Sequence, residues 1–188
     1  MFALRVGKFP VLFSIFLVGL IFGIFITSMV SQPSPITIDE GQIAPLTDRD
    51  YFTTVNSLLS SANRSIHMIM FDLRYYPEYP ESPGNYLLSS LSEAASRGVD
   101  VRVITDEYLT EKPLVNMLRE KGVNIKFDSK DVTTHAKLII IDSKFVIIGS
   151  TNWSYHSLEK NHEANVLIHS PSLAEEFERY FEKLWAES

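Results

Sequence analysis

Hydrophobic positions after residue 45 recur with two different periods, which predicts alternating helices and strands. Three stretches with helical spacing alternate with three short apolar runs that are suited to strands. The helical stretches cover residues 52–62, 87–95 and 114–118, and the strand-like runs cover residues 65–72, 99–103 and 123–127. Such alternation with short connections is typical of a parallel sheet covered by helices.

The second half of this region predicts a hairpin and one more strand. Two apolar runs, Leu138 to Ile141 and Phe145 to Ile148, flank Asp142-Ser143-Lys144 and predict antiparallel strands joined by a tight turn. Residues 165–169 predict a further strand, and residues 173–185 predict a closing amphipathic helix whose glutamates face water. We therefore expect an α/β fold with a mixed, mostly parallel sheet that is flanked by helices on both faces.

The N-terminal segment has the pattern of a membrane-spanning helix. From Phe9 to Val30 there are 22 uncharged residues, preceded by Arg5 and Lys8. As a helix this segment is about 33 Å long, which is enough for the hydrocarbon core of a bilayer. A cleaved signal peptide is the alternative, but its apolar region is usually shorter and ends in an A-x-A-like site. We expect one N-terminal transmembrane helix, with residues 1–30 as a membrane anchor or signal segment.

The residues that follow this segment divide into a linker and one domain. Residues 31–45 contain Pro33, Pro35, Gly41 and Pro45 and predict a linker. Residues 46–188 then form the candidate catalytic domain. Positive charge before the apolar segment and acidic residues after it predict a cytoplasmic N-terminus and an extracytoplasmic domain. If the segment is a cleaved signal, the same domain is secreted.

Composition narrows the chemistry that this domain can perform. The chain has 188 residues and no cysteine, which excludes disulfide scaffolds, thiol nucleophiles and cysteine-ligated zinc or iron–sulfur sites. Its formal net charge of −6 argues against a protein that coats nucleic acid through a bulk positive potential. A small basic cleft on an otherwise acidic protein is still compatible with this net charge.

One segment combines several chemically useful side chains at close spacing. It runs from His135 to Asn152 and reads HAKLIIIDSKFVIIGSTN. His135 and Lys137 are two residues apart on a predicted strand and therefore leave the same face of the sheet, where an imidazole and a cation suit an anionic substrate. Asp142 has the opposite parity and lies at the predicted turn, which makes it a poor candidate for contacting the same ligand. Ser150 and Asn152 follow the second strand and supply hydroxyl and amide groups that can hold oxyanions.

This segment resembles the HKD signature of the phospholipase D superfamily. The signature positions are filled by His135, Lys137, Asp142, Gly149, Ser150 and Asn152. The likeness extends from about Ile43 to Trp185, and Asn161-His162-Glu163 is similar to the acidic motif that follows downstream in the family. A single copy of the motif is typical of the compact nuclease-type members of bacteria and archaea, whereas lipid hydrolases and phospholipid synthases usually carry two.

The resemblance implies a metal-independent phosphodiesterase that forms a covalent phosphohistidine on His135. It further implies that Lys137 holds the nonbridging phosphate oxygens, that Glu163 fixes the histidine tautomer and that Asp142 is a supporting residue. Ser150 and Asn152 would complete the substrate-binding cradle. No metal and no other cofactor is expected, because lysine charge already neutralises the phosphate.

One histidine is insufficient for in-line displacement at phosphorus. A nucleophile must attack on one side while a proton donor serves the leaving oxygen on the other. A two-fold dimer brings His135 of each chain to the axis, so we expect a homodimer with one shared site. The expected substrate is DNA or RNA cut by an endonuclease. A phospholipid phosphodiesterase or transferase and a catalytically silent phosphate-binding module are the alternatives.

Overall fold

The computed structural model describes residues 13–20, 22, 35–129 and 131–188, in two compact units divided after Thr37. In the first unit, residues 13–20 are helical. The predicted transmembrane segment, Phe9 to Val30, lies mostly outside the described residues. Within the described part of the chain, no helix has both the length and the apolar run required to traverse a bilayer.

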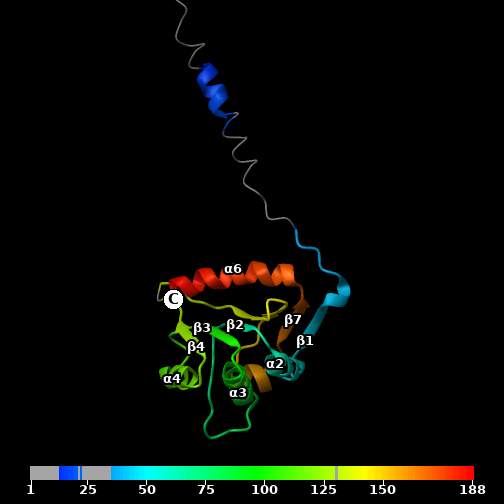
Figure 1. The fold of residues 1–188 in the computed structure, drawn as a ribbon, viewed down its shortest axis with the longest axis vertical. Coiled ribbons are helices and arrows are strands. Elements are labelled where there is room, and N and C mark those ends of the chain that lie inside the picture. Colours follow the sequence, from blue (N-terminus) through cyan, green and yellow to red (C-terminus); the bar gives the residue numbers. More distant parts are fainter. Residues whose placement is uncertain (1–12, 21, 23–34, 130) are drawn as a thin grey trace, which may run out of the picture. The chain divides into compact units, whose positions relative to one another are not determined.

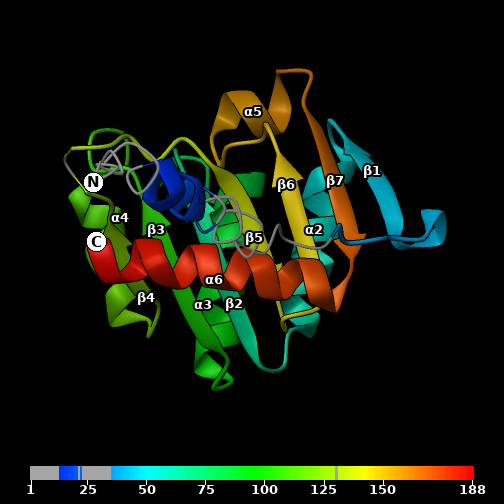
Figure 2. The same cartoon turned by 90° about the horizontal axis from the view of Figure 1, so that it is seen from above.

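The second unit, Ile38–Ser188, is built around one seven-stranded sheet with the order β1-β7-β6-β5-β2-β3-β4 (Figure 2). In chain order the strands are β1 (Ile43–Thr47), β2 (Ser65–Met70), β3 (Asp100–Thr105), β4 (Asn124–Phe127), β5 (Lys137–Ile141), β6 (Phe145–Gly149) and β7 (Ala164–His169). The predicted strands and the predicted hairpin are therefore confirmed. The first strand, β1, is the one that the hydrophobic pattern did not indicate.

Helices cover both faces of this sheet, as expected. They are α2 (Asp50–Ser61), α3 (Pro83–Ser96), α4 (Lys112–Glu120), α5 (Tyr155–Glu159) and α6 (Pro171–Glu187), with a short 3-10 turn, η1 (Glu40–Gln42), before β1. Helix α6 runs across one face alone, while α2, α3 and α4 lie on the other (Figures 1 and 2). The two faces bury separate hydrophobic clusters, so each layer has its own apolar core.

The expectation of a mostly parallel sheet is wrong. Only the pairs β2/β3 and β3/β4 are parallel, and each of the other neighbouring pairs is antiparallel. The reason lies in the connection between β5 and β6, a turn in which Asp142 and Ser143 adopt positive φ angles of 54° and 52°. So short a turn joins only antiparallel strands, because a parallel pair needs a crossover of about a dozen residues. The hairpin pairs with β2 through β5, and from β2 to β1 each strand runs antiparallel to its neighbour.

Strand β1 includes Ile43, Ala44 and Pro45, residues that the sequence analysis placed in the linker. It pairs with β7 in antiparallel register, with Pro45 opposite Val166. Because β1 lies at the edge of the sheet, a proline is tolerated there even though it lacks a backbone N–H. The sequence analysis did not predict β1 because most of its residues are exposed and one is a proline, so its sequence lacks the alternation of apolar and polar residues that indicates a strand.

Local signals explain where helix α3 begins and ends. The Ser82 hydroxyl accepts a hydrogen bond from the backbone N–H of Asn85, and Pro83 occupies the first turn, where its missing N–H costs nothing. The chain leaves the helix at Gly98, whose φ of 88° is strained for residues with a side chain. The predicted stop of this helix at Gly98 is thereby confirmed.

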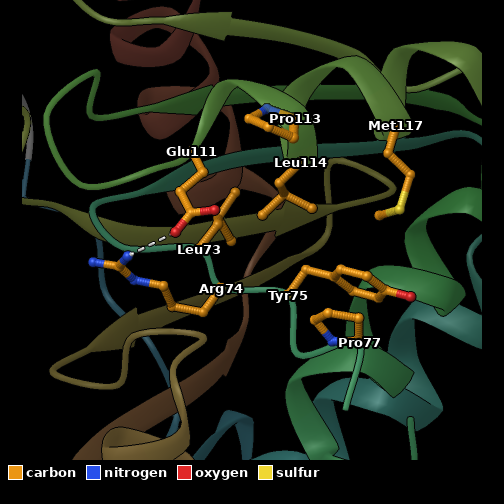
Figure 3. A pocket seen from close by; sticks show the side chains of 8 residues that line it. All are labelled: Leu73, Arg74, Tyr75, Pro77, Glu111, Pro113, Leu114 and Met117. Carbon is orange, nitrogen blue, oxygen red and sulfur yellow. Dashed lines mark ion pairs between the residues drawn. The ribbon is translucent and has the colours of Figure 1, made fainter. Parts of the chain in front are cut away.

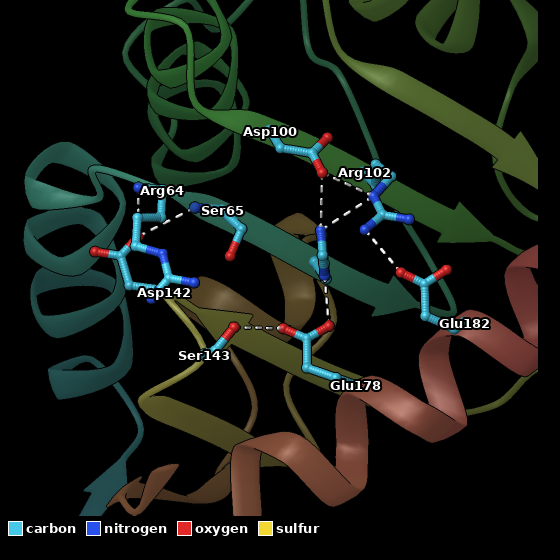
Figure 4. A network of polar contacts seen from close by, with 9 residues as sticks. Arg64, Ser65, Asp100, Arg102, Asp142, Ser143, Glu178 and Glu182 are labelled. Carbon is cyan, nitrogen blue, oxygen red and sulfur yellow. Dashed lines mark hydrogen bonds and ion pairs between the residues drawn. The ribbon is translucent and has the colours of Figure 1, made fainter.

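The glutamates of α6 do not all face water. Glu178 lies with its carboxylate 2.5 Å from the Nδ1 of buried His67 on β2, and Glu182 pairs with Arg102 on β3 at 2.8 Å (Figure 4). The expectation of a fully solvated glutamate face is therefore wrong for Glu178, which is largely covered, whereas Glu182 stays exposed beside its ion pair. They tie α6 to the sheet through ion pairs beside the apolar contacts of the helix.

Candidate active site

Five of the six candidate site residues gather at one end of the strands, where β5 begins and β6 ends, and Asp142 is the exception. Lys137 is the first residue of β5. His135 was expected on the same strand, but it lies in the segment just before β5. Ser150 and Asn152 follow the last residue of β6, and Glu163 directly precedes β7. Because β5, β6 and β7 are neighbours in antiparallel register, these ends of the strands meet at the same edge.

The side chains of Lys137 and His135 are in direct contact. The Nζ of Lys137 donates a hydrogen bond to the backbone oxygen of His135 at 2.8 Å and lies 3.2 Å from Nδ1 and 3.4 Å from Nε2 of the imidazole. An ammonium group can only donate, so this contact requires an unprotonated ring nitrogen. A nucleophilic imidazole needs the same neutral form, and the arrangement therefore suits attack on an electrophilic phosphorus.

Lys137 is buried, and burial lowers the pKa of its ammonium group, while the charges of Glu163 and Asp72 oppose that change. A cation with little water around it attracts an anion more strongly than a solvated one does. Lys137 is thus placed to hold phosphate oxygens beside His135.

Two residues that follow β2 belong to the site and were missed by the sequence analysis. The Phe71 ring lies 4.3 Å from the His135 ring, measured between centroids, and 4.7 Å from the Nζ of Lys137. The Asp72 carboxylate pairs with Arg74 at 2.7 Å, and burial raises the pKa of Asp72 against the opposing charge of Arg74. The available signal was the position of both residues at the end of a buried strand next to β5. The site residues that they lie beside, His135 and Lys137, are however about 60 residues further along the chain.

Glu163 and Ser150 are also brought together. Glu163 accepts hydrogen bonds from the Ser150 hydroxyl and from the Asn161 amide, the latter at 3.0 Å. Burial acts to raise the pKa of Glu163, but these hydrogen bonds together with the charge of Lys137 hold it below its usual value. No hydrogen bond joins Glu163 to His135 among the described residues, so its role in fixing the imidazole tautomer stays a prediction.

The loop after β6 places Asn152 with spare hydrogen-bonding capacity. Its Oδ1 atom is buried and has no hydrogen-bond partner within the described part of the chain, which is unusual for a buried polar atom. The preceding Thr151 is locked in place by Asn165 on β7, whose amide oxygen accepts from the Thr151 N–H at 3.2 Å and whose amide nitrogen donates to the Thr151 hydroxyl at 2.8 Å. Asn165 is therefore a further supporting residue that the sequence analysis missed.

Asp142 lies at the opposite end of β5 from Lys137. Its carboxylate accepts hydrogen bonds from the backbone N–H groups of Asn63, Arg64 and Ser65, the shortest being 2.7 Å from Arg64 (Figure 4). Burial acts to raise its pKa, but these three hydrogen bonds keep the pKa below its usual value. The expectation that Asp142 is poorly placed to contact the ligand agrees with this geometry. Its contacts join the β5–β6 turn to the start of β2.

Two cavities flank the loop that follows β2. One of about 300 Å³ has mostly apolar walls, with Arg74 and Glu111 3.8 Å apart at its rim (Figure 3). The other, of about 750 Å³, is lined in part by Tyr76, Tyr79 and Tyr155. Within the described residues, no three histidine, aspartate or glutamate side chains are placed to hold a metal ion.

Comparisons with known proteins identify the family and the fold. Residues 55–185 match the family described as cardiolipin synthase, PLD-like domain. The chain is 28% identical over 170 residues to the mitochondrial cardiolipin hydrolase of Xenopus tropicalis, covering 82% of this chain and 74% of that protein. Among solved structures it is similar to Nuc from Salmonella typhimurium, a phospholipase D family member, with a TM-score of 0.65, 27% identity and coverage of 77% of this chain and 95% of that one. NucT from Helicobacter pylori shares the fold, with a TM-score of 0.62, 21% identity and coverage of 77% and 97%.

Proposed function

Because this chain belongs to the cardiolipin synthase, PLD-like domain family of the phospholipase D superfamily, whose members are phosphodiesterases, we propose that it hydrolyses phosphodiesters through a phosphohistidine intermediate on His135. The observation that carries this proposal is the contact between the buried Lys137 ammonium group and the His135 imidazole. The imidazole nitrogen attacks phosphorus and forms a P–N bond as the bond to the leaving oxygen breaks. Water then attacks the phosphohistidine and releases the phosphate product and the free imidazole.

The site is completed by a second copy of the chain. No second histidine is hydrogen-bonded to, or in ring contact with, His135 or Lys137 among the described residues. A leaving oxygen nevertheless needs a proton from the side opposite the nucleophile. A homodimer with two-fold symmetry supplies the second His135 as that proton donor and a second Lys137 as a further phosphate ligand. An imidazole can serve in both roles, because it attacks in its neutral form and donates a proton in its charged form.

The other site residues have supporting roles in this scheme. Ser150 and Asn152 bind the nonbridging oxygens through the serine hydroxyl and the asparagine Nδ2, because only these groups can donate. The unpartnered Oδ1 atom of Asn152 is an acceptor and is free to take a hydrogen bond from an O–H or N–H group of the substrate. Glu163 turns toward its own His135 once substrate engages the Ser150 hydroxyl, and it then fixes the tautomer as the carboxylate of a triad does. No metal and no other cofactor takes part, because two ammonium groups and two imidazoles provide the charge that the transition state needs.

We propose nucleic acid, DNA or RNA, as the substrate, cut internally. The single HKD motif in a short chain supports this choice, as does the likeness to Nuc over nearly the whole length of that protein. A phospholipid is the second candidate, favoured by the similarity to a cardiolipin hydrolase and by the acidic charge of the chain, which repels a polyanion.

The uncharged segment from Phe9 to Val30 anchors the domain to a membrane in this proposal. With Arg5 and Lys8 on the cytoplasmic side, the catalytic domain lies outside the cytoplasm. The support is the length of the uncharged run and the charge asymmetry around it. Tagging Ser188 and testing its access to a protease in intact cells distinguishes an outer from an inner location.

A substrate panel tests the proposed activity. The full-length protein in detergent is given plasmid DNA, single-stranded DNA, RNA or vesicles of anionic phospholipid, each with EDTA present. We expect cleavage of nucleic acid that is lost in His135→Ala and retained in His169→Ala, whose histidine lies at the other end of the sheet. Lipid turnover that depends on His135 selects the second candidate, and binding without turnover of any substrate contradicts both.

A further inference from the structure

Phe71 contacts both members of the candidate catalytic pair. Its ring is tilted by 50° to the His135 ring at a centroid distance of 4.3 Å, and the Nζ of Lys137 lies over the same ring at 4.7 Å. The three side chains thus contact one another, because Nζ is also within 3.4 Å of both nitrogens of the imidazole. Aromatic faces attract cations and also pack against other rings, so one phenyl ring stabilises both partners.

The backbone fixes where this ring lies. Phe71 follows directly after β2, whose last residue, Met70, is opposite Lys137 in the antiparallel pair with β5. The next residue along the chain, Phe71, therefore lies beside the segment that carries His135 and Ala136. The ring is held by the sheet, whereas Lys137 has a long side chain with several rotatable bonds.

Phe71 is not an ordinary core residue. It belongs to neither hydrophobic cluster of the sheet and is only partly buried. Its ring contacts within the described residues are with the two candidate catalytic side chains. A residue that packed only for stability would have aliphatic neighbours in one of the two cores.

We propose that Phe71 is a positioning residue that holds the Lys137 ammonium group against the His135 imidazole through the face of its ring. This inference rests on the proposed phosphodiesterase function and adds a requirement to it. With the ring removed, Lys137 rotates toward solvent and His135 loses the surface that sets its orientation. The electron density of the ring matters as well as its volume, because the attraction to the cation is electrostatic.

Fluorination of this ring separates electrostatics from packing. Mono-, tri- and pentafluorinated phenylalanine at position 71 keep nearly the same shape while progressively removing the negative ring face. Phe145 provides the matched control, since it stacks on His169 with centroids 4.7 Å apart at the opposite end of the sheet. Turnover of bis-p-nitrophenyl phosphate by the full-length protein gives kcat and KM for each variant.

We expect kcat to fall stepwise with fluorination of Phe71, by roughly threefold to thirtyfold in total, while KM changes by less than about twofold. Phe71→Leu should lose at least as much, Phe71→Tyr should recover most of the activity, and the same fluorinated residues at position 145 should leave kcat unchanged. Equal losses at both positions, or an unchanged kcat across the Phe71 series, would overturn the inference.

Two further measurements distinguish failure of this inference from failure of the proposed function. His135→Ala must abolish turnover; if it does not, the phosphohistidine proposal fails and the positioning role fails with it. If turnover depends on His135 but not on the Phe71 ring, the inference fails alone. Independently of activity, the Lys137 side-chain methylene protons should resonate upfield in the NMR spectrum and return to ordinary shifts in Phe71→Leu. Ordinary shifts in the wild-type protein would contradict the geometry.

Discussion

The Glu163 carboxylate accepts a hydrogen bond from the Ser150 hydroxyl, which joins the start of β7 to the end of β6 at the candidate site. The same carboxylate acts on Lys137 through its charge, which opposes the burial that lowers the pKa of the lysine. Glu163 thus connects a predicted substrate-binding residue with the predicted phosphate-binding cation. Its own pKa is held below the usual value, so it is ionised throughout the neutral range.

Glu163→Gln should reduce kcat by roughly tenfold to a hundredfold, because the neutral amide does not hold the imidazolium form as a carboxylate does. Loss of the negative charge also lowers the pKa of Lys137 further. The alkaline limb of the profile of kcat/KM against pH, where Lys137 loses its proton, should therefore move to lower pH. Glu159→Gln on α5 is the matched control and should change neither kcat nor the pH at which the alkaline limb of the kcat/KM profile falls. A limb that moves to higher pH would contradict this electrostatic assignment.

Asp142→Asn should destabilise the fold without removing catalysis. Three backbone N–H groups bind this carboxylate, and loss of its charge in a partly exposed position should lower the free energy of unfolding by about 1–2 kcal/mol. Since the folded-state pKa of Asp142 is below its ordinary value, its contribution is present above about pH 4 and is lost as pH falls through the folded-state pKa.

Urea unfolding at neutral and acidic pH measures this difference, with the exposed Glu120→Gln as control. The gap between wild type and Asp142→Asn should shrink as the pH falls below the usual aspartate range. A tenfold loss of kcat per folded molecule at unchanged stability would instead place Asp142 in the catalytic machinery.

Glu178→Ala should destabilise the attachment of α6. The substitution leaves His67 buried without the carboxylate that lies 2.5 Å from its Nδ1, and we expect a loss of about 2–3 kcal/mol. Glu175→Ala on the same helix removes only an exposed pair with Arg179 and should leave the free energy of unfolding nearly unchanged. Equal effects of the two substitutions in urea titrations would show that the His67 contact adds nothing to stability.

Gly149→Ala should be poorly tolerated because β6 approaches β7 closely at this position. A Cβ atom there would lie 2.2 Å from the Asn165 side-chain oxygen and 2.6 Å from the backbone oxygen of Ala164. Relief of that clash requires the strands to move apart, which should cost about 1–3 kcal/mol and displace Ser150. Gly41→Ala, with open space around the added Cβ, is the control. Thermal unfolding and measurement of kcat test this prediction. A Gly149→Ala variant with the wild-type unfolding temperature and the wild-type kcat would contradict it.

Much of the fold could be predicted because helices and strands bury one face and leave a periodic pattern. The exceptions share a physical reason. Strand β1 is an exposed edge that contains Pro45, so it has no apolar alternation, and its pairing with β7 joins residues more than 100 positions apart. The hairpin predicted that β5 and β6 are antiparallel to each other. The hydrophobic pattern of a single segment does not indicate which other strand β5 pairs with, so its position next to β2 was not predicted.

The candidate site was predictable where its residues lie close together in sequence. His135, Lys137 and Ser150 were found because one short segment carries them. Phe71 and Asp72 were missed because they reach the site through the pairing of β2 with β5, and a phenylalanine after an apolar strand is ordinarily a core residue. The contacts of Glu178 were missed since helical periodicity identifies a polar side chain but not a buried partner on the sheet.

The central claim is that His135 from two chains acts on one phosphorus atom. Heterodimers that carry one wild-type chain and one differently tagged His135→Ala chain can be purified by sequential affinity steps and assayed on the preferred substrate. The account predicts that these heterodimers have no more than about a hundredth of wild-type kcat, because the single shared site lacks either its nucleophile or its proton donor. Half of the wild-type activity in the heterodimer, or full activity of a strictly monomeric chain, would contradict it.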